Sequence, residues 1–83
     1  MSTRILFFAQ LRELLGCSQI EVAIDAPLSV AELRSKLIEQ HPEWEAHLQN
    51  GQVLQAVNQI LVNNKAIVQP GDEVALFPPV TGG

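Results

Sequence analysis

The sequence predicts a two-layer α+β domain in which one main helix packs across a mixed β-sheet. Short apolar segments of strand length stand before and after a single long amphipathic segment, residues 29–40. That segment carries helix signals at both ends. Strands near the two ends of the chain can be parallel neighbours, because the helix between them can cover the crossover.

The first half of the chain is expected to contain two strands and a short helix. Residues 4–9 are apolar on both alternating faces, which indicates a strand with the core on one side and apolar cover on the other. Residues 10–15 place leucines at helical spacing, and Gly16 stands where it can end that helix. Residues 20–25 alternate apolar and polar side chains, as in a half-buried strand.

The main helix has the best-marked boundaries in the chain. Ser29 with Glu32 three residues later predicts a capping box at the start. Pro42 disfavours a helical conformation at the residue before it, so the helix should stop near Gln40. One apolar stripe runs along the helix, formed by Val30, Leu33, Leu37 and Ile38.

The second half is expected to return to strands. A short helical turn within residues 43–49 would place Trp44 and Leu48 on one side. Residues 69–72, Gln-Pro-Gly-Asp, are typical of a tight turn. Strands are predicted at residues 53–57, 60–62 and 73–77.

Composition excludes several classes of function. The 83 residues suit one small domain, and 47% hydrophobic residues argue against disorder. The net charge is −4 with five scattered basic residues, which argues against nucleic-acid binding. One cysteine, Cys17, excludes an internal disulfide and a cysteine-based metal centre within the chain. Neither a membrane-length run nor a signal-peptide pattern is found, so we expect a cytoplasmic protein. From the residue types and their spacing we expect no metal site.

The segment 78–83 is predicted to be a flexible tail that delivers a carboxylate. Pro78 and Pro79 cannot continue a central strand ladder and favour an extended, stiff base. Gly82 and Gly83 lack a Cβ, so this part of the backbone can enter a slot too narrow for other residues. The alternative is an ordinary frayed end, because chain termini are usually disordered. The strand and the two prolines directly before the glycines favour the delivery role.

Four blocks of sequence resemble a known family. They are residues 7–13 (Phe-Phe-Ala-Gln-Leu-Arg-Glu), 56–58 (Ala-Val-Asn), 71–75 (Gly-Asp-Glu-Val-Ala) and 77–83 (Phe-Pro-Pro-Val-Thr-Gly-Gly). Together they resemble the small subunit of molybdopterin synthase over nearly the whole chain, and residues 71–83 are the most specific part. Thr81 departs from the serine of many members. The resemblance implies a ubiquitin-like β-grasp fold and a single sulfur-carrier domain spanning residues 1–83.

The resemblance also implies a chemistry for the tail. An ATP-dependent activating enzyme would adenylate the carboxylate of Gly83, and a sulfurtransferase system would replace the adenylate with sulfur. The resulting thiocarboxylate would enter the large synthase subunit, in an expected heterotetramer, and donate sulfur to cyclic pyranopterin monophosphate. This chain would then be the non-catalytic sulfur donor without a permanently bound cofactor, and the catalytic groups would lie on the large subunit.

The candidate site residues fall into two groups. Because neighbouring strand residues point to opposite faces, Phe7 and Phe8 cannot both face the helix, so one of them should lie on a docking surface. Arg12 matches the family motif, and it either pairs with an acidic partner or is a solvated helix charge. The expected partner-binding residues are Phe7, Phe8, Arg12, Leu61 and Phe77. The residues expected to insert into the partner are Pro79, Val80, Thr81, Gly82 and Gly83.

The cysteine and the two histidines give weaker sequence signals for a functional site. Cys17 has no cation beside it in sequence and is interpreted as an incidental thiol. His41 and His47 lack the spacing of a metal site, and His41 is expected near the helix C-terminus, a position that suits a positively charged side chain.

Two alternative functions remain open at this level. Sulfur carriers of other pathways, such as thiamine biosynthesis, share the fold and the Gly-Gly end, but they are typically shorter and lack the blocks around residues 7–13 and 77–80. A ubiquitin-like modifier would instead be attached to lysines. Co-purification with a large synthase subunit, or the chemical fate of the terminal carboxyl group, separates these functions. A small β-grasp ferredoxin is excluded because one cysteine cannot hold a cluster.

Overall fold

The computed structural model describes residues 2–48 and 53–78 of the chain. The elements in this part are, in order, β1 Ser2–Phe7, α1 Ala9–Leu15, β2 Gln19–Ala23, β3 Leu28–Ser29, α2 Val30–Gln40, the 3-10 helix η1 Pro42–Trp44, α3 Glu45–Leu48, β4 Leu54–Val57, β5 Ile60–Val62, β6 Ile67–Val68 and β7 Glu73–Phe77. No helix among these residues is both long enough and apolar enough to cross a membrane.

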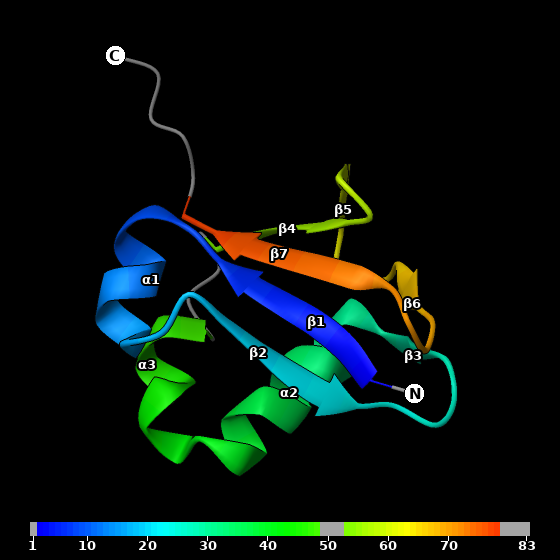
Figure 1. Cartoon of the computed structure of the whole chain (residues 1–83), viewed down its shortest axis with the longest axis horizontal. Coiled ribbons are helices and arrows are strands. Elements are labelled where there is room, and N and C mark those ends of the chain that lie inside the picture. Colours follow the sequence, from blue (N-terminus) through cyan, green and yellow to red (C-terminus); the bar gives the residue numbers. More distant parts are fainter. Residues whose placement is uncertain (1, 49–52, 79–83) are drawn as a thin grey trace.

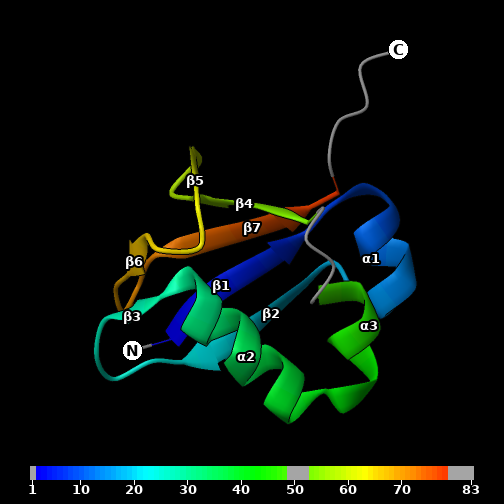
Figure 2. The same ribbon diagram turned by 180° about the vertical axis from the view of Figure 1, so that it is seen from behind.

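The main sheet has five strands in the order β2-β1-β7-β4-β5. β1 and β7 pair in parallel, with Arg4 opposite Glu73 and Phe7 opposite Leu76, and the other neighbours in this sheet are antiparallel. The predicted adjacency of the first and last strands is therefore confirmed. α2 and α3 lie together on one side of the sheet, which gives the two-layer architecture (Figures 1 and 2).

Hydrogen bonds satisfy the first backbone N–H groups of α2. The Glu32 N–H donates to Ser29 Oγ at 3.1 Å, and the Ser29 N–H donates to the Glu32 carboxylate at 3.0 Å, which confirms the capping box. The N–H groups of Val30 and Ala31 donate to the carbonyls of Ala66 (2.9 Å) and Asn64 (3.1 Å). These are groups that a helix cannot satisfy internally. The start of α2 is thereby tied to the loop that follows β5.

This capping box should make stability pH-dependent on the acid side. Hydrogen bonds from the Ser29 backbone, and then from its side chain, lower the pKa of Glu32. The contribution is full above the unfolded-state pKa and is lost as the pH falls through the depressed folded-state pKa, because the unfolded chain binds this proton more readily. Urea midpoints of wild type and Glu32→Gln, which keeps the acceptor without the charge, should converge between neutral pH and about pH 3. A constant gap between the two midpoints would contradict the assignment.

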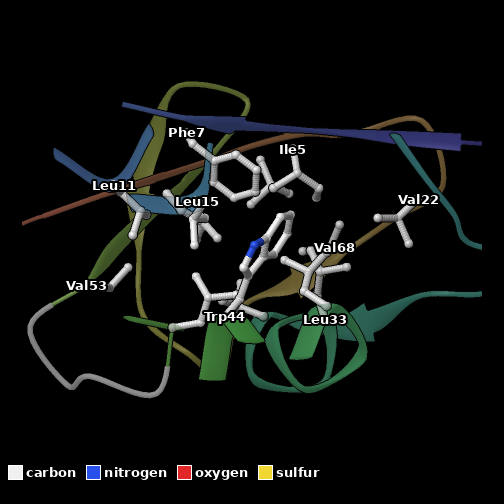
Figure 3. Close-up of a cluster of buried hydrophobic side chains, with 14 of the residues drawn as sticks. Ile5, Phe7, Leu11, Leu15, Val22, Leu33, Trp44, Val53 and Val68 are labelled. Atoms are coloured by element: carbon white, nitrogen blue, oxygen red, sulfur yellow. The ribbon is translucent and has the colours of Figure 1, made fainter. Parts of the chain in front are cut away.

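The core fills the space between the sheet and the helices, as Figure 3 shows. The helix stripe is confirmed, since Val30, Leu33 and Leu37 are at most 1% exposed and Ile38 is partly buried against them. Trp44 packs edge-on against the ring of Phe7, with centroids 5.5 Å apart. The other fully or largely buried apolar side chains of the cluster are Ile5, Leu11, Leu15, Val22, Ile24, Leu48, Val53, Val57, Val68, Val74 and Leu76.

Besides strand ends that shift by one or two residues, such as those of β2 (Gln19–Ala23), the structure differs from the expected elements in two main places. β1 ends at Phe7 rather than continuing to residue 9, because Ala9 adopts a φ of 55° that turns the chain into α1. A small second sheet, β3 paired with β6, was not predicted, since each of its strands has only two residues. This second sheet joins the start of α2 to the segment before the turn at residues 69–72.

Candidate functional site

An apolar row crosses the face of the sheet that points away from α2. Strand register places Leu6 beside Ala75, Ala75 beside Ala56, and Ala56 beside Leu61. Side chains alternate between the two faces of a strand, and the neighbours Ile5, Val57, Val74 and Leu76 lie in the core cluster while this row does not. The row therefore belongs to the opposite face of the sheet.

A second group of apolar residues continues this face towards the end of β7. Leu54 pairs with Phe77 in the register of β4 and β7. The Phe8 N–H donates to the Leu76 carbonyl at 3.2 Å, so Phe8 lies beside the end of β7. Phe8 is 47% exposed and Leu61 is 65% exposed, which leaves large apolar side chains open to a partner. We call this surface the outer face, and it consists of Leu6, Phe8, Leu54, Ala56, Leu61, Ala75 and Phe77.

Charged residues bound the outer face at the other end of the strands. Arg4 stands in register with Glu21 on β2 and with Glu73 on β7. Arg4 and Glu21 are exposed. An apolar centre with a charged rim is typical of a protein-binding surface.

The tail begins where the outer face is most apolar. β7, the middle strand of the sheet, ends at Phe77, and Pro78 is the last described residue at this end. The predicted insertion residues Pro79, Val80, Thr81, Gly82 and Gly83 lie outside the described part of the chain. Their roles remain predictions.

The structure brings together most of the predicted docking residues and corrects one. Phe8, Leu61 and Phe77 lie on the outer face. Phe7 was wrongly included, because strand alternation turns it into the core, where it is 1% exposed and packs on Trp44. Arg12 is exposed on α1, and its pairing with a partner stays a prediction.

The sequence did not single out Leu6, Leu54, Ala56 and Ala75. Alternation within residues 4–9 was the available signal for Leu6. The other three could be placed only after the register between β4 and β7 was known.

Two side chains that could take part in a reaction, Cys17 and His41, have surroundings that favour a structural role. Burial raises the pKa of the half-buried Cys17 thiol, which reduces its thiolate fraction. His41 stacks on Trp44 with centroids 3.9 Å apart, and its Nδ1 lies 3.5 Å from the Glu43 carboxylate. Within residues 2–48 and 53–78, no group of three or more His, Cys, Asp or Glu side chains could hold a metal ion.

The fold and the outer face together define a ubiquitin-like β-grasp domain. The structure of SAMP1, a small archaeal modifier protein from Haloferax volcanii, superimposes with a TM-score of 0.81. The two chains are 27% identical, and the match covers 100% of each.

The chain belongs to the ThiS family, whose family model matches residues 5–83. The molybdopterin synthase sulfur carrier subunit of Escherichia coli is 50% identical over 80 residues, which cover 96% of this chain and 98% of the relative. The subunit of the same name from Haemophilus influenzae is 43% identical over 79 residues, covering 95% and 96% of the two chains.

Proposed function

We propose that this chain is the sulfur carrier subunit of a molybdopterin synthase and that it carries sulfur as a thiocarboxylate on Gly83. The observation that carries the proposal is the 50% identity to a subunit of that name over nearly the full length of both chains. The thiocarboxylate also suits a domain in which burial raises the pKa of the Cys17 thiol, because a thiocarboxylate carries sulfur without a cysteine.

Loading of the tail requires an activated carboxyl group. A carboxylate is a poor acyl donor, so an ATP-dependent activating enzyme would first convert the Gly83 carboxylate into an acyl-adenylate, with loss of pyrophosphate. The terminal sulfur of a sulfurtransferase persulfide would then attack the acyl carbon and displace AMP, and a thiol would reduce the resulting acyl disulfide to release the Gly83 thiocarboxylate. ATP is consumed on the activating enzyme, and no permanently bound cofactor is required on this chain. A cytoplasmic location is part of the proposal, because this step needs a compartment that holds ATP.

Transfer of the sulfur would take place inside the large synthase subunit. The outer face docks on that subunit, and residues 79–83 enter its active site, where the thiocarboxylate meets cyclic pyranopterin monophosphate. The large subunit supplies the acid–base groups, so this chain is a non-catalytic sulfur donor. Two such transfers build the dithiolene, and the assembly is a heterotetramer.

Mass spectrometry tests this function directly. The intact protein, isolated from its native host, should contain a fraction whose mass shows one oxygen-to-sulfur exchange at Gly83. That fraction should convert cyclic pyranopterin monophosphate to molybdopterin when mixed with the large subunit. Sulfur found on Cys17 instead of Gly83 would exclude the proposal.

Attachment to lysines is a second candidate function, favoured by the likeness to a small archaeal modifier protein. A modifier would use the same acyl-adenylate but would end as an isopeptide on a target lysine. Peptides from host proteins that carry a Gly83-linked lysine would support this function. Thiocarboxylate without such peptides supports the carrier function alone.

Competition between partners tests the role of the outer face. If the activating enzyme and the large subunit both cover this face, each should displace the other from wild-type carrier. Leu61→Asp should weaken both complexes about tenfold to a hundredfold, because it buries a charge in an apolar contact. Ile67→Asp is the matched control, since Ile67 is 56% exposed but lies on β6, outside the main sheet. A ternary complex of one carrier with both partners would rule this surface out.

A further inference from the structure

Arg34 lies on α2 with only 9% of its surface exposed, which is unusual for an arginine. Its guanidinium donates from Nη1 to Gln55 Oε1 at 3.1 Å and to Asn64 Oδ1 at 3.3 Å. Its Nη2 donates to the carbonyl of Leu48 at the end of α3. One side chain on the helix therefore contacts β4, the loop after β5 and α3.

The network continues from Arg34 into β5. Gln55 Nε2 donates to the Val62 carbonyl at 2.7 Å. The Asn64 carbonyl accepts from the Ala31 N–H at 3.1 Å. These bonds hold the end of β5, at Val62 through Gln55 and in the following loop through Asn64.

β5 has few other contacts that could fix its position. Within the described residues it pairs only with β4, over three residues. Ile60 and Leu61 are about two-thirds exposed, and Val62 is the member of β5 that packs on the core. A groove of about 690 Å³ lies between α2 and the β4–β5 hairpin and is lined in part by Arg34, Gln55, Val62 and Asn64. Apolar packing between α2 and β5 is therefore incomplete.

Folding stability alone does not explain why an arginine occupies this buried position. Burial disfavours the charged guanidinium and lowers the pKa of Arg34. Replacing a buried charged network by apolar side chains is often neutral or stabilising, whereas such networks can specify one geometry. The geometry specified here is that of the β4–β5 hairpin relative to α2.

We propose that Arg34 is a positioning residue that holds the β4–β5 hairpin against α2 and thereby fixes Leu61 within the outer face. The inference rests on the proposed function, because it takes the large synthase subunit as the partner that contacts Leu61. Arg34 acts from within the domain and does not itself touch that partner.

Three variants separate the effect of Arg34 on the position of the β4–β5 hairpin from its effect on the stability of the domain. Arg34→Met removes the donors and leaves Gln55 with an unsatisfied buried acceptor. Arg34→Met with Gln55→Met also removes the unsatisfied Gln55 acceptor, which should recover part of the lost stability, while the Leu48 and Val62 carbonyls lose their bonds to these two side chains. Val22→Ala is the matched control, because it weakens the core from β2, at the opposite edge of the sheet from β5.

The measurements are the unfolding midpoint, amide hydrogen exchange of residues 60–64 in the free protein, and the Kd for the large synthase subunit. Both Arg34 variants should show faster exchange and a Kd raised about tenfold, which corresponds to about 1.4 kcal/mol. Val22→Ala should keep the Kd within about twofold despite its lower midpoint. If Arg34→Met does not fold, Arg34→Lys, which keeps the charge without the planar fork, should raise the Kd in the same direction.

A double variant that recovers both stability and wild-type affinity would overturn the positioning role. So would a Val22→Ala variant whose Kd rises as much as that of Arg34→Met. If wild-type carrier does not bind the large subunit, the proposed function fails. In that case the exchange measurement on the free protein still decides whether Arg34 holds the hairpin.

Discussion

Deletion of Gly83 is expected to abolish adenylation and sulfur transfer while leaving the unfolding midpoint unchanged. The truncated chain ends about 3.4 Å short of its reacting position. Displacement of a reacting atom by about 1 Å can already reduce a rate around a hundredfold. The described core ends at Leu76, so the deletion removes no side chain on which that core depends.

A second tail variant separates the effect of tail length from the effect of side-chain size. Gly82→Val keeps the length of the tail, but its β-branched side chain should be excluded from a slot built for glycine. Thermal unfolding should be paired with ATP–pyrophosphate exchange and a mass assay for the thiocarboxylate. A folded Gly83 deletion that still forms a fully active thiocarboxylate is incompatible with the carrier function.

Leu37→Ala is expected to destabilise the domain by about 2–5 kcal/mol, the usual range for deletion of a fully buried leucine side chain. Leu37 is 0% exposed and stands in the middle of the helix stripe that faces the sheet. The lost contacts would leave a cavity at the centre of the two layers, where close-packed surroundings relax only partly.

Urea unfolding of Leu37→Ala and Glu39→Ala measures this effect against a matched control. Glu39 is exposed on the same helix, so its substitution should change the free energy of unfolding by no more than about 0.5 kcal/mol. A loss below about 1 kcal/mol for Leu37→Ala would mean that the stripe does not support the core.

Local signals in the sequence were sufficient for most of the fold. The α2 boundaries depend on Ser29, Glu32 and Pro42, which act on groups within a few residues of themselves. The parallel pairing of β1 with β7 followed from the order of the elements, because a helix between two strands allows them to lie side by side.

The one wrong assignment and the features that were not predicted depend on distant parts of the chain. Alternation showed that Phe7 and Phe8 differ in direction, but only the assembled sheet shows that Phe7 faces Trp44. The burial of Arg34 depends on Gln55 and Asn64, which are 21 and 30 residues away. The two-residue strands β3 and β6 are too short for any periodicity to appear.

The place of β7 in the sheet has a consequence for how this protein is made. β1 and β4 share β7 as their neighbour, yet β7 is the last of the described strands to leave the ribosome. A nascent chain that stops before Glu73 cannot join its two sheet halves, and it exposes apolar edges that favour aggregation and degradation. Completion of the sheet therefore waits for synthesis of the strand that carries the tail. A chain interrupted before that point lacks the strand that joins the two halves of the outer face, so we expect it not to compete for partners.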